Sequence, residues 1–165
     1  MRLGSKRPPV DVAAGERVLA WTRTTTGEVL AGTREAIYLD GQRLAWQDVE
    51  AADWDRDTEL LRVVEVGSWG QPRGEHRYPI SEPGRLLELV RERVTASVLL
   101  VRHVPIDGRR GVRVIARRPP AGNRELRHDI HWVYEFDEGI DPADPAVRSA
   151  AQAALASARD EVGLD

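Results

Sequence analysis

A run of short strand patterns between Arg17 and Ile80 is the feature that most limits what this chain can fold into. Apolar and polar residues alternate there in short stretches separated by turn residues, as expected for half-buried strands. Seven such stretches precede a segment with helical spacing. Grouped strands followed by a single helix predict antiparallel pairing and an α+β fold, rather than a doubly wound parallel sheet.

Two local signals fix positions within this run. The dipeptide Asp40-Gly41 lies between two apolar stretches and predicts a tight hairpin, because both positions of such a turn need a positive φ. The segment from Glu59 to Val66 is apolar on both faces, which is typical of a strand covered on both sides. We therefore expect the strands to curl into a half-barrel.

The segment after the strands has the pattern of an amphipathic helix. Ser81 is expected to cap it, with Pro83 in the first turn. Its apolar side chains share one side at helical spacing: Leu86, Leu87, Leu89, Val90 and Val94. We expect this helix to cover the open end of the half-barrel.

After the helix the strand patterns return, and the sequence then predicts a second helix. Three strands are expected within residues 97–104, 112–117 and 127–136, with a polar loop over 105–111. Asp144 is expected to cap an alanine-rich helix that ends at Gly163. The chain thus divides into a loose lead-in (1–15), a strand-rich half with its helix (16–95), and a three-stranded antiparallel sheet with a helix (96–165) that packs on that half.

Composition excludes several classes of protein. The 165 residues include no cysteine, which excludes disulfides and thiolate chemistry. The longest purely apolar run, Val98 to Val101, is too short to span a bilayer, so no membrane insertion is expected. The first residues lack the apolar stretch of a secretory signal, which makes the cytoplasm the expected location. A net charge of −3 gives no overall attraction to nucleic acid.

Two segments carry a resemblance to a known fold. Residues 27–39 contain a Thr-x-x-x-ϕ-Tyr-ϕ strand that ends just before the tight turn, and residues 44–54 contain Trp46-Gln47-Asp48-Val49. Residues 14–94 resemble the bacterial pleckstrin-homology-like (PH-like) fold, and nearly the whole chain is similar to an actinobacterial family without an established activity. The resemblance implies a seven-stranded half-barrel capped by a helix. It does not imply phosphoinositide binding, since Arg23 is the only basic residue of the first hairpin.

A group of arginines is the main candidate for binding. The six are expected on the hairpin of the second half and its flanks, where they form a patch for a phosphate, an acidic peptide or RNA. Two alternatives explain the same residues: internal pairing with the acidic segment from Glu135 to the C-terminus, or protection of a sheet edge. Trp69 is a further candidate, as a partner contact or as a cap on the barrel end. The arginines are Arg102, Arg109, Arg110, Arg113, Arg117 and Arg118.

Other polar clusters favour structural roles. His128 and His131 lie three apart, so on a strand they point to opposite faces and do not chelate one ion. Acidic residues near Asp144 favour the start of a helix over a calcium site. Asp48 is expected to bond main-chain amides at a strand junction. An acidic run in the strand-rich half is expected to be solvated: Glu50, Asp53, Asp55, Asp57 and Glu59.

No nucleophile with a base, metal-ligand set or phosphate loop can be assembled from the sequence. We therefore expect a non-catalytic module without a cofactor that binds a protein or an acidic peptide, or a second copy of itself. The alternative is a binder of nucleic acid or an anionic ligand through the arginine-rich hairpin, residues 102–118.

Overall fold

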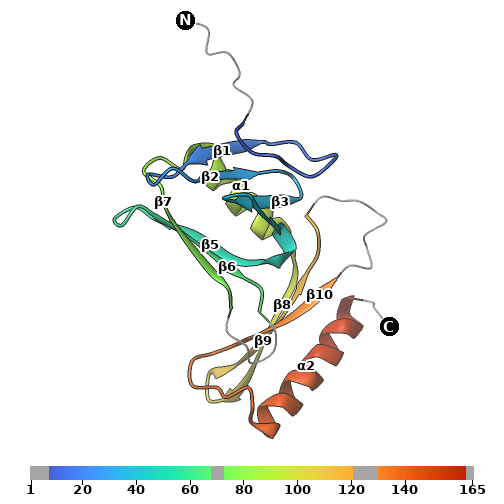
Figure 1. Cartoon of the computed structure of the whole chain (residues 1–165). Helices are drawn as coiled ribbons and strands as arrows, with labels where there is room; N and C mark the ends of the chain where they lie inside the picture. Colours follow the sequence, from blue (N-terminus) through green and yellow to red (C-terminus); the bar gives the residue numbers. More distant parts are fainter. Residues whose placement is uncertain (1–7, 68–72, 121–129, 163–165) are drawn as a thin grey trace, which may run out of the picture.

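The computed structural model describes residues 8–67, 73–120 and 130–162 (Figure 1). Over these ranges the chain forms ten strands in three antiparallel sheets, together with two α-helices. This arrangement confirms the α+β class. Seven of the strands precede helix α1, and three lie between α1 and helix α2.

The first sheet is four-stranded, with its strands in sequence order. Its central hairpin turns at Asp40 and Gly41, whose φ values of 51° and 87° confirm the predicted tight turn. Gly32 allows a close approach to the helix that covers the sheet, because an added Cβ would lie 2.6 Å from Leu89 Cδ2. The strands are β1 (Ala20–Arg23), β2 (Val29–Gly32), β3 (Ala36–Leu39) and β4 (Gln42–Ala45).

A short 3-10 helix, η1 (Trp46–Asp48), leads into the second sheet. This sheet has three strands in the order β5-β6-β7. The strand predicted to be covered on both faces is its central strand, β6, which buries Leu61 and Val63 on one face and leaves Arg62 on the other face partly exposed. The three strands are β5 (Val49–Asp55), β6 (Leu60–Glu65) and β7 (Glu75–Pro79).

Helix α1 (Gly84–Ala96) shares one apolar core with the first two sheets. It contacts β1, β2 and β5 and buries Leu86, Leu89 and Val90, three of the five side chains predicted to do so, while Leu87 and Val94 are partly exposed. The predicted cap is wrong, because the helix begins at Gly84 after Pro83, without a side-chain cap. Two tryptophan indoles of this core bond main-chain carbonyls of distant segments. Trp46 Nε1 donates to the Thr33 carbonyl, and Trp54 Nε1 donates to the Ile80 carbonyl, both at 2.9 Å.

The described part of the lead-in is attached to the first sheet. Val10, Val12 and Val18 pack on the sheet face that points away from α1, against a small buried cluster around Tyr38. The lead-in is therefore not loose over this part. Its polar composition did not show that two of its valines, Val10 and Val12, would pack on a sheet face together with Val18.

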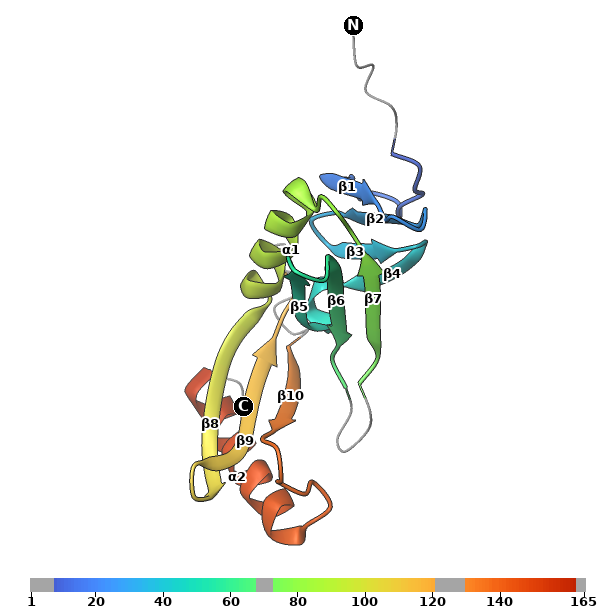
Figure 2. The same cartoon turned by 90° about the vertical axis from the view of Figure 1, so that its left-hand side faces the viewer.

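The third sheet has the order β10-β9-β8 and carries α2 on one face (Figures 1 and 2). The predicted loop over 105–111 is wrong, because β8 continues to Asp107 and turns at Gly108 and Arg109. Pro105 interrupted the sequence pattern, but proline is tolerated on an edge strand beside a bulge. The elements are β8 (Val98–Asp107), β9 (Arg110–Arg117), β10 (His131–Phe136) and α2 (Pro145–Val162).

Helix α2 begins as predicted. Asp144 Oδ1 accepts a hydrogen bond from Ala146 N at 2.9 Å, which satisfies an amide of the first turn. Four small side chains then pack on the sheet: Val147, Ala151, Ala154 and Ala158.

Candidate functional site

A cleft of about 560 Å³ lies where the third sheet meets the first two. Three separate parts of the chain line it: the β4–η1 junction, the end of β6 with the residues after it, and the first part of β10. The lining residues are Leu44, Asp48, Glu65, Val66, Gly67, His131, Trp132, Val133 and Tyr134. Clefts between packed units are common places for ligands to bind.

One side of the cleft is apolar and aromatic, and α2 supports it. Trp132 lies under the guanidinium of Arg159, whose Cζ is 6.0 Å from the ring centroid. Tyr134 stacks on Phe136 with the ring centroids 6.4 Å apart, and burial raises the pKa of Tyr134. The aromatic side chains are therefore held in place by the sheet and by α2.

The other side of the cleft is acidic. Glu65 Oε2 lies 2.9 Å from His76 Nε2 on the neighbouring strand. The main-chain carbonyl of Asp48 accepts a hydrogen bond from Val66 N at 2.7 Å, which ties η1 to the end of β6. The Asp48 carboxylate is half-buried and bonds no amide among the described residues, so the bonding expected of it is not seen there.

A second polar cluster joins the C-terminal sheet to β5. Glu50 Oε2 forms an ion pair with Arg73 Nη1 at 2.9 Å, and only 6% of the Glu50 side chain is exposed. Arg117 Nη2 donates to the Glu50 main-chain carbonyl at 2.9 Å, and Arg117 Nη1 donates to Ser97 Oγ at 3.3 Å. Burial raises the pKa of Glu50 and lowers the pKa of Arg117.

The expectation of a solvated acidic run is thus wrong for Glu50 and holds for its other four members, which are exposed. The burial of Glu50 could not be predicted from the sequence, because the alternation of residues in β5 does not show that Arg117 lies against the first residues of that strand. Glu50 bonds Arg73 through its carboxylate and Arg117 through its main-chain carbonyl, which makes this cluster a structural tie, since none of the three side chains lines the cleft.

Three of the six candidate arginines pair internally. Arg102 Nε donates to Glu161 Oε2 at 2.9 Å, on α2. Arg113 Nη1 lies 3.3 Å from Asp137 Oδ1 and 3.8 Å from Glu135 Oε1. Arg117 is buried, as described above. The internal pairing considered from the sequence, with the acidic segment that begins at Glu135, therefore accounts for Arg102 and Arg113. Arg117 instead bonds Ser97 and the main chain of Glu50.

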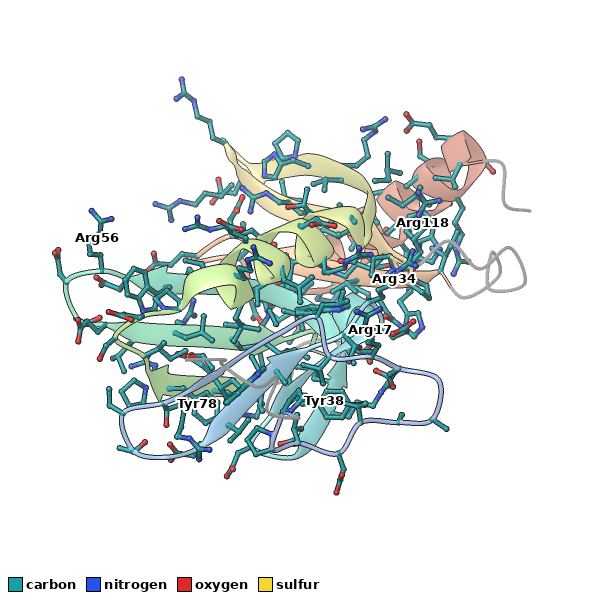
Figure 3. All side chains as sticks on the ribbon, turned by 90° about the horizontal axis from the view of Figure 1, so that it is seen from above. Arg17, Arg34, Tyr38, Arg56, Tyr78 and Arg118 are labelled. Carbon is teal, nitrogen blue, oxygen red and sulfur yellow. The ribbon has the colours of Figure 1, made fainter. Side chains whose placement is uncertain are left out.

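The other three arginines do not form one surface. Arg109 and Arg110 are exposed at the hairpin tip. Arg118 follows the far end of β9, about 25 Å away at the usual rise of a strand. Figure 3 shows Arg118 on the same side of the molecule as Arg34 and Arg17. The structure thus separates residues that the sequence placed in one patch.

Asp137 organises the hairpin on the sheet face away from α2. Its Oδ2 accepts a hydrogen bond from Gly111 N at 2.8 Å and lies 2.9 Å from His103 Nε2. These bonds, with the charge of Arg113, lower the pKa of Asp137, and the contact with His103 is the largest cause. The Asp137 carboxylate therefore links the end of β10 to β8 and β9.

Trp69 and His128 lie outside the described residues. Within the described ranges, no three His, Asp or Glu side chains are grouped to hold a metal ion. Neither helix of the described chain is long and apolar enough to cross a membrane. No family model, curated protein or solved structure matches this chain.

Proposed function

We propose that this chain is a non-catalytic module that binds a short segment of a partner protein in the cleft between η1, β6 and β10. The observation that carries the proposal is the lining of that cleft, aromatic on one side and acidic on the other. Such a lining suits a segment with an apolar side chain next to a cationic one. The acidic side favours a basic segment over the acidic peptide expected from the arginines.

We also propose that β1–β7 and α1 form the PH-like half-barrel that the sequence resembles. The four-stranded sheet, the three-stranded sheet and the helix packed on β1, β2 and β5 support this reading. In this arrangement the half-barrel supplies the acidic side of the cleft, and the C-terminal sheet supplies the aromatic side.

The test uses three pools of short synthetic peptides with the same apolar positions. The remaining positions carry Lys or Arg in the first pool, Asp or Glu in the second, and Ser or Thr in the third. Amide chemical shifts of the whole protein report binding residue by residue. We expect the cationic pool to bind most tightly and to shift the amides of Val66, Gly67 and residues 131–134.

Asp48→Asn is the matched variant, because it removes the charge and keeps the shape. Its affinity for the cationic pool should fall about fivefold, since an ion pair near the surface contributes about 1 kcal/mol. Asp160→Asn, on the exposed side of α2, should leave the affinity unchanged. If no pool moves the cleft amides, the proposed function is wrong.

The alternative, a nucleic acid or anionic ligand bound through residues 102–118, has less support. Three of its arginines are engaged within the protein, and Arg118 is far from the hairpin tip. Amide shifts around Arg109 and Arg110 with the acidic pool, and none in the cleft, would favour this alternative.

A further inference from the structure

A second hollow of the molecule, a groove of about 460 Å³, lies beside β1. β1 is the edge strand of the first sheet, at the top of the molecule in Figure 1. No residue of this groove lines the cleft between η1, β6 and β10, so the groove is a separate site. The first hairpin and the segment that leads into α1 form its lining: Trp21, Thr22, Arg23, Thr25, Ser81 and Glu82.

The two walls of the groove are bonded to each other. Thr25 N, in the turn after β1, donates to the Pro79 carbonyl at 2.9 Å. Thr22 Oγ1 donates to the Glu82 carbonyl at 3.5 Å. The groove is therefore formed before any ligand arrives, and its size is within the range of small-ligand sites.

The apolar surface of the groove comes from a tryptophan that the fold does not need for its core. Trp21 is 39% exposed, and its indole N–H makes no hydrogen bond to another described residue. Trp46 and Trp54, by contrast, donate their indole N–H to main-chain carbonyls inside the protein. An exposed indole suits a ligand with an apolar face and a polar rim, because the ring itself combines an apolar body with a polar N–H.

The polar side chains of the groove are available to a ligand. Two other hydroxyls of the same hairpin are not, because Thr24 and Thr26 both bond the Glu28 carboxylate. A hydroxyl can donate and accept, and a carboxylate accepts, so the lining suits a ligand with several groups that do both. Over the described ranges, three side chains of the lining form no hydrogen bond or ion pair: Thr25, Ser81 and Glu82.

The charges of the groove balance. Arg23 is its only basic residue and Glu82 its only acidic one. An anion would meet the Glu82 carboxylate, and a cation would meet the Arg23 guanidinium. The lining therefore favours a ligand without net charge.

We propose that this groove binds a neutral saccharide, with one pyranose ring lying flat on the indole of Trp21. The C–H groups on one side of the sugar ring pack on the negatively polarised face of the indole. The hydroxyls at the rim of the sugar exchange hydrogen bonds with Arg23, Thr25 and Glu82. This inference is independent of the cleft and stands whether or not the cleft binds a peptide.

The test is a titration of the whole protein with five neutral sugars: glucose, galactose, mannose, maltose and cellobiose. We expect at least one of them to shift the indole N–H signal of Trp21 and the amides of Thr22, Arg23 and Glu82. Its affinity should not change with added salt, because the ligand carries no charge. Inorganic phosphate and the three peptide pools are titrated in the same way.

The variants separate stacking from a loss of structure. Trp21→Ala should weaken sugar binding at least about tenfold, whereas Trp21→Phe keeps an aromatic face and should retain most of the affinity. Leu19→Ala is the matched control, since Leu19 is 43% exposed and does not line the groove, and its affinity should equal that of the wild type.

Three results would overturn the proposal. One is that no sugar shifts the groove signals at millimolar concentration. Another is that phosphate or a peptide pool shifts them and no sugar does, which would make the groove an anion site or a place where a peptide strand pairs with β1. The third is that Trp21→Ala binds the sugar as tightly as the wild type.

Discussion

Arg117 of β9 donates a hydrogen bond from Nη2 to the main-chain carbonyl of Glu50 in β5, at 2.9 Å. The two residues are 67 positions apart, and the bond joins the C-terminal sheet to the strand-rich half of the chain. Arg117 is 3% exposed, and its Nε has no hydrogen-bond partner among the described residues. The Arg117 guanidinium is therefore largely shielded from water. The charge of Glu50 and hydrogen bonds to Ser97 and to the Glu50 carbonyl stabilise it there.

Replacing Arg117 should destabilise the protein strongly. Arg117→Ala leaves the buried carboxylate of Glu50 with Arg73 as its remaining neighbouring arginine, and it leaves a cavity between the two halves. Losing the two hydrogen bonds of a buried guanidinium, together with its charge beside Glu50, costs about 3 kcal/mol or more. Arg118→Ala is the matched control, since Arg118 is exposed and surface replacements change stability by about 0.5 kcal/mol or less. Urea unfolding of both variants measures the difference, and equal midpoints would contradict a role for Arg117 in joining the halves.

Glu50 should give the stability of the protein a distinctive pH dependence. Burial raises the pKa of this carboxyl above its ordinary value of 4.5, so the folded state holds the proton more tightly than the unfolded state does. The stability that protonated Glu50 contributes is complete below pH 4.5 and is lost as the pH rises through the raised pKa. Glu50→Gln cannot lose this proton, and its stability lacks this fall.

The measurement for Glu50 is the free energy of unfolding of the wild type minus that of Glu50→Gln, followed from acid to neutral pH. Carboxyls whose pKa is lowered by folding, such as Glu16 and Asp137, gain stability as the pH rises, but they contribute equally to both proteins and cancel. We expect the difference to fall with rising pH. A difference that is constant or rises would show that Glu50 is not desolvated.

Local signals in the sequence were enough to predict the strands and the two helices. The alternation of apolar residues, Asp40-Gly41 and the cap at Asp144 each act over a few residues, so a short window contains the whole interaction. The same short range explains two errors. Within a few residues of sequence, Pro105 predicts the end of a strand, although an edge strand with a bulge tolerates proline. Ser81 has the residue type of a cap, but the helix begins three residues later.

The candidate site could not be predicted because it depends on contacts between distant segments. Asp48, Glu65 and Trp132 come from three different parts of the chain and meet only after the sheets pack. The arginines posed the same problem in reverse. Their spacing suggested one patch, but two of them pair with acidic residues far along the chain. Arg102 pairs with Glu161 on α2, and Arg113 pairs with Glu135 on β10 and with Asp137 just after it. Charge patterns in a sequence do not reveal which charges are already paired in the fold.

The Tyr38 hydroxyl should contribute measurably to stability. It donates to Glu16 Oε2 at 3.1 Å and accepts a hydrogen bond from Ala13 N at 2.8 Å. Burial alone would raise the pKa of Glu16, but hydrogen bonds from Thr33, Arg43 and Tyr38 lower it. Tyr38→Phe leaves Ala13 N without its partner and should cost about 1–2 kcal/mol.

Tyr78→Phe is the control for this prediction. Its hydroxyl makes no hydrogen bond within the described ranges, and Figure 3 shows it well apart from Tyr38. Tyr38→Phe should also speed proteolysis of the lead-in around Ala13, because a bond that holds it to the sheet is lost. Equal stability and equal cleavage rates in the two variants would mean that the valines alone hold the lead-in.

Gly111 should tolerate no side chain. A Cβ at this position would lie 1.8 Å from the Val104 carbonyl oxygen, and the main chain of β8 cannot move away without breaking the pairing. Gly111→Ala should therefore cost about 3 kcal/mol or more in thermal or urea unfolding. Gly74→Ala is the informative comparison, because its Cβ would meet Glu65 Oε2 at 2.2 Å, the far end of a flexible side chain that can swing aside. If the two variants lose the same stability, the close approach of β8 to Gly111 is not a property of the folded protein.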